Sequence, residues 1–148
     1  VDSPSFHGVM QALKGFGMKA LELPTDPLTG ISLEALELAL EQWPIKAIQL
    51  TPNCNNPLGY IMPESRKRAL LNLAQRFDVA IIEDDIYADF QEGPATRLAT
   101  LDSEQRVIYM GSFSKTLSSS LPAWQVQPGK GSKARMRRAS TSGLMAKP

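Results

Sequence analysis

A lysine follows a short apolar run late in the chain, in surroundings that suit covalent chemistry. Lys115 lies in the segment 111–117, directly after the apolar residues 107–110, and its neighbours are small hydroxyl residues without any carboxylate. A lysine amine in this setting can act as a nucleophile and form a Schiff base with a carbonyl cofactor. A solvated loop lysine fits the same segment, so the rest of the chain must separate the two interpretations.

Two other groups of polar residues come after apolar runs in the same way. Asn56 lies in a loop rich in asparagine and proline after one run, and Asp84 and Tyr87 follow the next run. Apolar runs of this length are typical of buried strands. Because the carboxyl ends of parallel strands lie at one edge of a sheet, these side chains and Lys115 are expected to converge at one site.

An acid, a phenol, an amide and an amine around one pocket suit a protonated pyridine ring. Asp84 would keep the ring nitrogen protonated, which makes the ring an electron sink. Tyr87 and Asn56 would hydrogen-bond to a phenolic oxygen of the ring. Lys115 would form the imine and later move a proton.

Two serines and an aromatic residue complete the candidate site. The hydroxyls of Ser112 and Ser114 would donate hydrogen bonds to a phosphate. Phe6 would stack on the face of the ring, or else belong to the core. His7, the single histidine, has no His or Cys partner, so the sequence predicts no metal site.

The polar candidates also have structural interpretations. Asp84 would cap the segment that follows it, and Asn56 and Tyr87 would be buried residues that hydrogen-bond within the fold. The other acids of the same segment, Asp85 and Asp89, are expected to be solvated.

The elements that would position these residues alternate between helix and strand. Helical spacing, caps and prolines predict helices at 9–17, 32–43 and 63–77, and apolar runs predict strands at 18–23, 47–50, 79–82 and 107–110, the last broken by Gly111. This alternation predicts an α/β fold, a three-layer α/β/α arrangement with a mostly parallel sheet.

Charge is distributed unevenly along the 148 residues. Residues 1–118 carry 10 Lys and Arg against 15 Asp and Glu, whereas residues 119–148 carry 6 Lys and Arg and no acid. Such a basic segment either binds nucleic acid or forms a loose, misassembled end. No run is long enough for a membrane span, and no signal peptide is visible. The single cysteine, Cys54, fits a cytoplasmic protein.

Three motifs in order carry a resemblance to a known family. They are Asn56-Pro57-Leu58-Gly59, Asp84-x-x-Tyr87 and Ser112-Phe113-Ser114-Lys115. Together they resemble the fold-type I pyridoxal-phosphate aminotransferases (class I/II). The residues around them are most similar to the aminotransferase-like domain of MocR-type transcriptional regulators. The resemblance covers residues 1–121, as part of the large, cofactor-binding domain. Residues 122–148 are expected to be an atypical basic tail, disordered or altered by a reading-frame disturbance.

The resemblance implies pyridoxal 5'-phosphate as the cofactor and a homodimer for the full-length protein. It also implies a cis peptide bond between Asn56 and Pro57. The roles that it gives to the candidates are Lys115 as the Schiff-base lysine, Asp84 as the partner of the pyridine nitrogen, Tyr87 and Asn56 as partners of the phenolic oxygen, Ser112 as a phosphate ligand, and Phe6 as the stacking aromatic.

The family pattern is interrupted after the lysine. The family places a phosphate-binding arginine seven or eight residues further on, where this chain has Pro122 and Ala123. Without this arginine the chain is expected to be inactive by itself. The absence of a starting Met indicates a piece of a longer protein.

Two functions remain open at this point. One is amino-group transfer from an amino acid through a Lys115 Schiff base. The other is an effector-sensing domain of a MocR-type (GntR-family) regulator that binds an amine and reports it to a DNA-binding domain not present in this chain. A third interpretation is that the chain is an inactive fragment with neither function.

Overall fold

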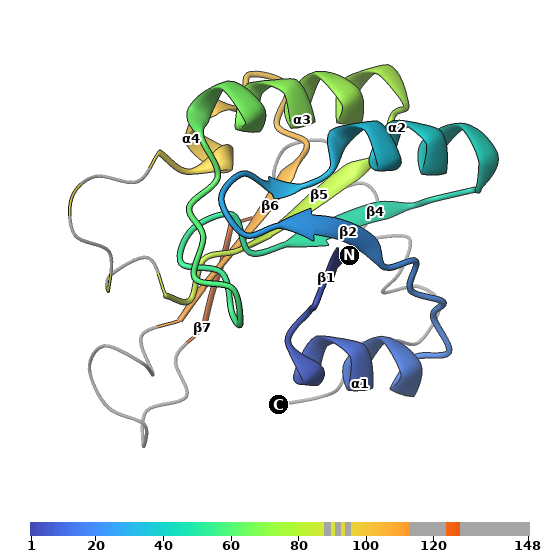
Figure 1. The fold of residues 1–148 in the computed structure, drawn as a ribbon, viewed down its shortest axis with the longest axis horizontal. Helices are drawn as coiled ribbons and strands as arrows, with labels where there is room; N and C mark the ends of the chain where they lie inside the picture. Colours follow the sequence, from blue (N-terminus) through green and yellow to red (C-terminus); the bar gives the residue numbers. More distant parts are fainter. Residues whose placement is uncertain (88–89, 91–92, 94–95, 113–123, 128–148) are drawn as a thin grey trace.

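The computed structural model describes residues 1–87, 90, 93, 96–112 and 124–127 (Figure 1). Its helices are α1 (His7–Gly15), α2 (Leu33–Gln42), α3 (Glu64–Arg76) and α4 (Leu98–Leu101). Its strands are β1 (Asp2–Ser3), β2 (Leu23–Asp26), β3 (Gly30–Ile31), β4 (Ala47–Leu50), β5 (Ala80–Asp84), β6 (Val107–Ser112) and β7 (Trp124–Gln127). Within this part of the chain, no helix is both long enough and apolar enough to pass through a bilayer.

The main sheet has the order β4-β5-β6-β7. β4, β5 and β6 are parallel neighbours, and β7 is antiparallel to β6. Figure 1 shows α2 and α3 side by side over one face of this sheet, and α1 on the other side of the molecule. The predicted α/β fold is thus confirmed, and three parallel strands end at one edge.

The core lies between the sheet and the helices α2 and α3. Apolar residues at helical spacing turn one face of each helix inward, and the strands supply alternating apolar side chains. Members of this core are Leu36, Leu40, Ile48, Leu50, Leu70, Ala74, Ile81 and Val107.

Local signals place α2 and α3 where the sequence predicts them. The Ser32 hydroxyl accepts a hydrogen bond from the backbone N–H of Ala35 at 3.1 Å, which satisfies a free donor in the first turn of α2. Pro63 immediately precedes α3, a position where its missing N–H costs nothing. The helices predicted at 32–43 and 63–77 are therefore confirmed to within a residue or two.

The strand predicted at 18–23 is wrong. Residues 18–22 have no regular secondary structure, and β2 begins only at Leu23 and runs through Pro24. A strand needs a hydrogen-bonding partner, and β1 and β3 lie beside residues 23–26. Pro24 is tolerated because its carbonyl oxygen makes the bond, accepting from the N–H of Ser32 at 2.8 Å.

Gly111 does not break the last parallel strand, contrary to the prediction. β6 continues through Gly111 to Ser112 because β7 pairs with both residues, Gly111 with Gln125 and Ser112 with Trp124. β7 falls in the range for which the sequence predicts an atypical basic tail. Residues 128–148 of that range lie outside the described part of the chain.

Candidate functional site

Candidate residues from three segments lie at the carboxyl edge of the parallel sheet. Asn56 is in the loop after β4, Asp84 is the last residue of β5, and Ser112 is the last residue of β6. The register aligns the strand ends, since Leu50 pairs with Glu83, and Asp84 with Met110. The predicted convergence of strand ends is therefore present in the fold.

Asn56 and Tyr87 contact each other directly. The Asn56 amide nitrogen donates to the Tyr87 hydroxyl at 3.3 Å, across 31 residues of sequence. The peptide bond between Asn56 and Pro57 is cis, as the resemblance implies. These two side chains thus present an amide and a phenol side by side.

Asp84 is a partly buried carboxylate with one buried, unsatisfied oxygen. Its Oδ1 atom is inaccessible to water and has no hydrogen-bond partner in the described structure. Burial raises the pKa of Asp84, and the negative charges of Asp85 and Asp2 raise it further, while a hydrogen bond from the Ile86 N–H acts in the opposite direction. A cationic donor placed against Oδ1 would relieve both the burial penalty and the missing bond.

The loop that carries Asn56 is braced by a second buried acid, Asp2. Its Oδ2 accepts from the Asn55 amide at 2.7 Å and from the Tyr60 hydroxyl at 3.3 Å. Asn55 in turn accepts from the N–H of Leu58 at 3.1 Å. Burial is the main cause of the raised pKa of Asp2. These bonds connect β1 to the loop on both sides of the cis peptide.

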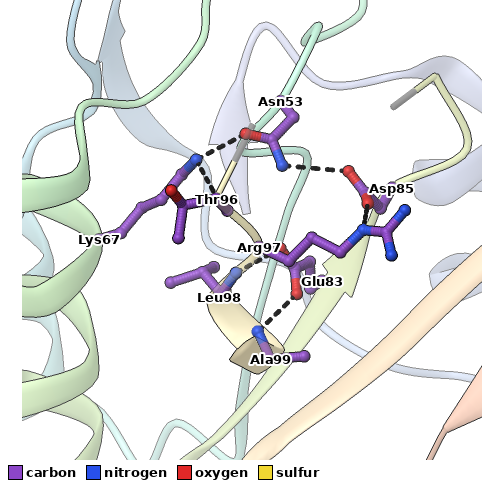
Figure 2. A network of polar contacts seen from close by, with 8 residues as sticks. All are labelled: Asn53, Lys67, Glu83, Asp85, Thr96, Arg97, Leu98 and Ala99. Carbon is purple, nitrogen blue, oxygen red and sulfur yellow. Dashed lines mark hydrogen bonds and ion pairs between the residues drawn. The ribbon is translucent and has the colours of Figure 1, made fainter. Parts of the chain in front are cut away.

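Asp85 is buried, so the expectation that it is solvated is wrong. Only 3% of the residue is exposed. Its Oδ1 accepts from the Asn53 amide at 3.1 Å, and its Oδ2 from the Arg97 guanidinium at 2.9 Å (Figure 2). The Tyr109 hydroxyl also donates to it, and burial together with the Asp85 charge raises the pKa of Tyr109 to about 12. Asp89 lies outside the described residues.

A buried lysine and a buried glutamate continue this network (Figure 2). Lys67 of α3 donates to Asn53 Oδ1 at 2.6 Å and to the Thr96 carbonyl at 2.7 Å. Glu83 accepts from the N–H groups of Leu98 and Ala99, at 2.7 and 2.9 Å, and so caps α4 from β5. Burial is the main cause of the raised pKa of Glu83, which is about 7.

The structure describes only two of the four remaining predicted site residues, Phe6 and Ser112. Lys115 and Ser114 lie outside the described residues. Phe6 precedes α1, and its half-exposed ring lies over the backbone at Gly8. Ser112 is in place at the end of β6. The roles of these four residues stay predictions.

A sequence profile of the class I and II aminotransferases matches residues 1–126 of the chain. The chain belongs to this aminotransferase family.

Curated relatives in the family include both regulators and enzymes. The uncharacterised HTH-type transcriptional regulator YjiR of Escherichia coli is 56% identical over 132 residues, which cover 88% of this chain and 28% of YjiR. A second Escherichia coli regulator of this type, YdcR, is 40% identical over 79% of the chain and 25% of YdcR. Aromatic-amino-acid aminotransferase 1 of Thermococcus litoralis is 32% identical over 80% of the chain and 30% of the enzyme. The chain thus spans less than a third of the length of these relatives.

Solved aminotransferases share the fold of this family member. The α-aminoadipate aminotransferase of Thermus thermophilus, solved with N-(5'-phosphopyridoxyl)-L-leucine, superposes with a TM-score of 0.84 at 29% identity, covering 99% of this chain and 39% of that one. A multiple-substrate aminotransferase of Thermococcus profundus gives 0.83 at 28% identity, covering 95% of this chain and 36% of that one. The fold is that of the pyridoxal-phosphate-dependent, fold-type I aminotransferases.

Sequence reasoning missed four buried charged residues of this aminotransferase-family chain. These are Asp2, Lys67, Glu83 and Asp85. Lys67 stands in a helix among other basic residues, and Asp85 in a run of three acids, so neither has a distinguishing neighbour in sequence. Their partners are 12 to 58 residues away, and only the folded chain identifies them.

Proposed function

We propose that this chain is the pyridoxal 5'-phosphate-binding part of an aminotransferase-like protein, with the cofactor at the edge of β4, β5 and β6. The observation that carries the proposal is the buried Asp84 Oδ1, which lacks a hydrogen-bond partner in the described structure. A protonated pyridine nitrogen supplies what this atom lacks, a donor and a positive charge. When bound, the cofactor supplies an electron sink for amino-group chemistry.

The other residues fit the remaining groups of such a ligand. Asn56 and Tyr87, which already contact each other, would donate to the phenolic oxygen. Lys115 would supply the amine that attaches the cofactor and moves the proton. The Ser112 and Ser114 hydroxyls would bind the phosphate, and Phe6 would cover the ring. Aminotransfer from an amino acid is the reaction that this set of groups supports.

The test is to mix the purified chain with pyridoxal 5'-phosphate and record the visible absorbance. Borohydride reduction and peptide mapping then locate the modified lysine. We expect an absorbance band, modification concentrated at Lys115, and loss of both in Lys115→Ala. The matched control is Lys14→Ala, on an exposed face of α1, which should keep both signals. Labelling spread over Lys130, Lys133 and other lysines would refute the proposal and favour an inactive fragment.

A second candidate is an effector-sensing domain of a MocR-type regulator. The higher identity to YjiR, 56% against 32% for the Thermococcus litoralis enzyme, supports it. In this version the full-length protein is a cytoplasmic homodimer that binds an amino acid or amine here and contacts DNA through a separate domain. Calorimetric binding of amino acids without release of an oxo acid would favour the regulator, and release of an oxo acid the enzyme.

A further inference from the structure

Two side-chain hydrogen bonds connect the loop after β4 with the segment after β5. One joins Asn56 to Tyr87 at 3.3 Å, and the other joins Asn53 to Asp85 at 3.1 Å. Asp84 immediately precedes Asp85, and neighbouring residues of an extended strand point to opposite faces of a sheet. The Asn53 bond therefore lies on the face opposite Asp84, toward α3 and α4 (Figure 2).

The Asn53 bond is better protected from water than the Asn56 bond. Asn53 is fully buried and Asp85 almost so, whereas Asn56 and Tyr87 are only partly buried. A buried hydrogen bond has no competing water, and breaking it leaves polar groups unsatisfied. The Asn53–Asp85 bond is therefore the stronger constraint on the distance between the two segments.

Lys67 and Asp85 together determine which way the Asn53 amide faces. A lysine ammonium can only donate, so it must bind the amide oxygen, and it does so at 2.6 Å. This leaves the NH₂ group of Asn53 directed to Asp85, a carboxylate that can only accept when ionised. Lys67 itself is 1% exposed and is held by the Thr96 carbonyl as well. Without this lysine, the buried amide oxygen loses its donor, and Asn53 is held by Asp85 alone.

We propose that Asn53, Lys67 and Asp85 form a positioning network that holds Asn56 and Tyr87 in place from the opposite face of the sheet. None of the three is a predicted cofactor contact. Asn53 acts through the loop that it shares with Asn56, and Asp85 through the segment that it shares with Tyr87. Lys67 acts through its hydrogen bond to the Asn53 amide. We test this inference by two measurements. One uses bound cofactor and rests on the function proposed above, whereas the other uses NMR and needs no cofactor.

The readout that needs no cofactor is made by NMR. The side-chain amide signal of Asn56 and the ring signals of Tyr87 are assigned and compared between the chain and two variants. Lys67→Met removes the donor at similar length, and Asn53→Asp keeps a partner for Lys67 but places a carboxylate against Asp85. Both should move the signals. Arg68→Met is the control, since Arg68 is the next residue of α3, is 58% exposed and pairs only with surface Glu64 in the described structure.

The cofactor readout is the pH midpoint of the absorbance change of bound pyridoxal 5'-phosphate. Donors at a phenolic oxygen favour its ionised form, so displacing Asn56 and Tyr87 should raise this midpoint. The expected shift is about one pH unit, the value of one hydrogen bond to a charged group. A residue that only stabilises the fold would lower the melting temperature without moving the midpoint.

The possible results separate the two proposals. Unchanged Asn56 and Tyr87 signals in folded Lys67→Met and Asn53→Asp would overturn the network, as would loss of folding in both variants, which would make its role purely structural. If Lys67→Met alone fails to fold, Asn53→Asp decides. If the unaltered chain shows no site-specific cofactor, the proposed function fails, and the NMR comparison still decides the network.

Discussion

Replacing Asp84 with asparagine should stabilise the cofactor-free chain and weaken cofactor binding. The Oδ1 atom is buried without a partner in the described structure, and the carboxyls of Asp85 and Asp2 add negative charge nearby. An amide of the same shape removes the buried charge and this repulsion, while its NH₂ group still lacks an acceptor. The net gain in the free energy of unfolding is therefore modest, about 1 kcal/mol, from partial cancellation of two such terms.

The same change should cost affinity. A hydrogen bond between a carboxylate and a protonated ring nitrogen contributes about 1.5–3 kcal/mol, which corresponds to a loss of roughly 10- to 100-fold in the dissociation constant. Opposite signs for stability and binding would be characteristic of a residue held for its ligand rather than for the fold.

The pH dependence follows from the raised pKa of Asp84, caused first by burial. A carboxyl whose pKa is higher in the folded than in the unfolded state contributes stability that is complete below the unfolded pKa. This contribution is lost as the pH rises through the folded pKa. The advantage of Asp84→Asn should therefore be present at pH 8 and disappear in acid.

Urea unfolding followed by circular dichroism, at about pH 4 and pH 8, measures the stability, and cofactor titration measures the affinity. Glu41→Gln, which removes an exposed carboxylate on α2, is the matched control and should change neither. The reasoning is refuted if Asp84→Asn is destabilising by the same amount at both pH values, or if it binds the cofactor as the unaltered chain does.

Two further predictions concern β5. Ile81→Ala should lower the free energy of unfolding by about 2–5 kcal/mol, because Ile81 is fully buried in a central strand. The control Leu38→Ala, at an exposed position, should change it by less than about 0.5 kcal/mol. Equal values for the two variants in urea unfolding would contradict the packing described above. Glu83 has a folded pKa of about 7, above its unfolded value of 4.5. As the pH rises from 4.5 through 7, the free energy of unfolding of the unaltered chain should therefore fall by up to about 3 kcal/mol relative to that of Glu83→Gln. A constant difference between these two proteins over that range would show that Glu83 does not titrate there.

Much of the fold was predictable because its signals are local. Helical spacing with Ser32 and Pro63 located α2 and α3, and apolar runs located β4, β5 and β6. The order of these elements implied a parallel sheet. The failures were at 18–23 and at Gly111, where the outcome depends on which segment supplies the hydrogen-bonding partner. Alternation of apolar residues does not identify that partner.

The candidate site shows the same division. The residue types at three strand ends, Asn56, Asp84 and Tyr87 among them, are enough to indicate an edge site, because strand direction alone brings such ends together. The contact of Asn56 with Tyr87 and the cis bond before Pro57 agree with that prediction. Lys115 stays a prediction.

The sequence by itself determined the order of elements, the residue types at the sheet edge and the family resemblance, since each of these depends on neighbouring residues. Only the tertiary structure decided which hydrogen-bond partners the three successive acids Glu83, Asp84 and Asp85 have. The first caps α4, the second is left with an unsatisfied oxygen in the described structure, and the third is neutralised by Arg97 and bound to Asn53. Their sequence surroundings are nearly the same, and their partners come from distant segments. The physical reason is that burial and hydrogen bonding are properties of the assembled layers, not of the local chain.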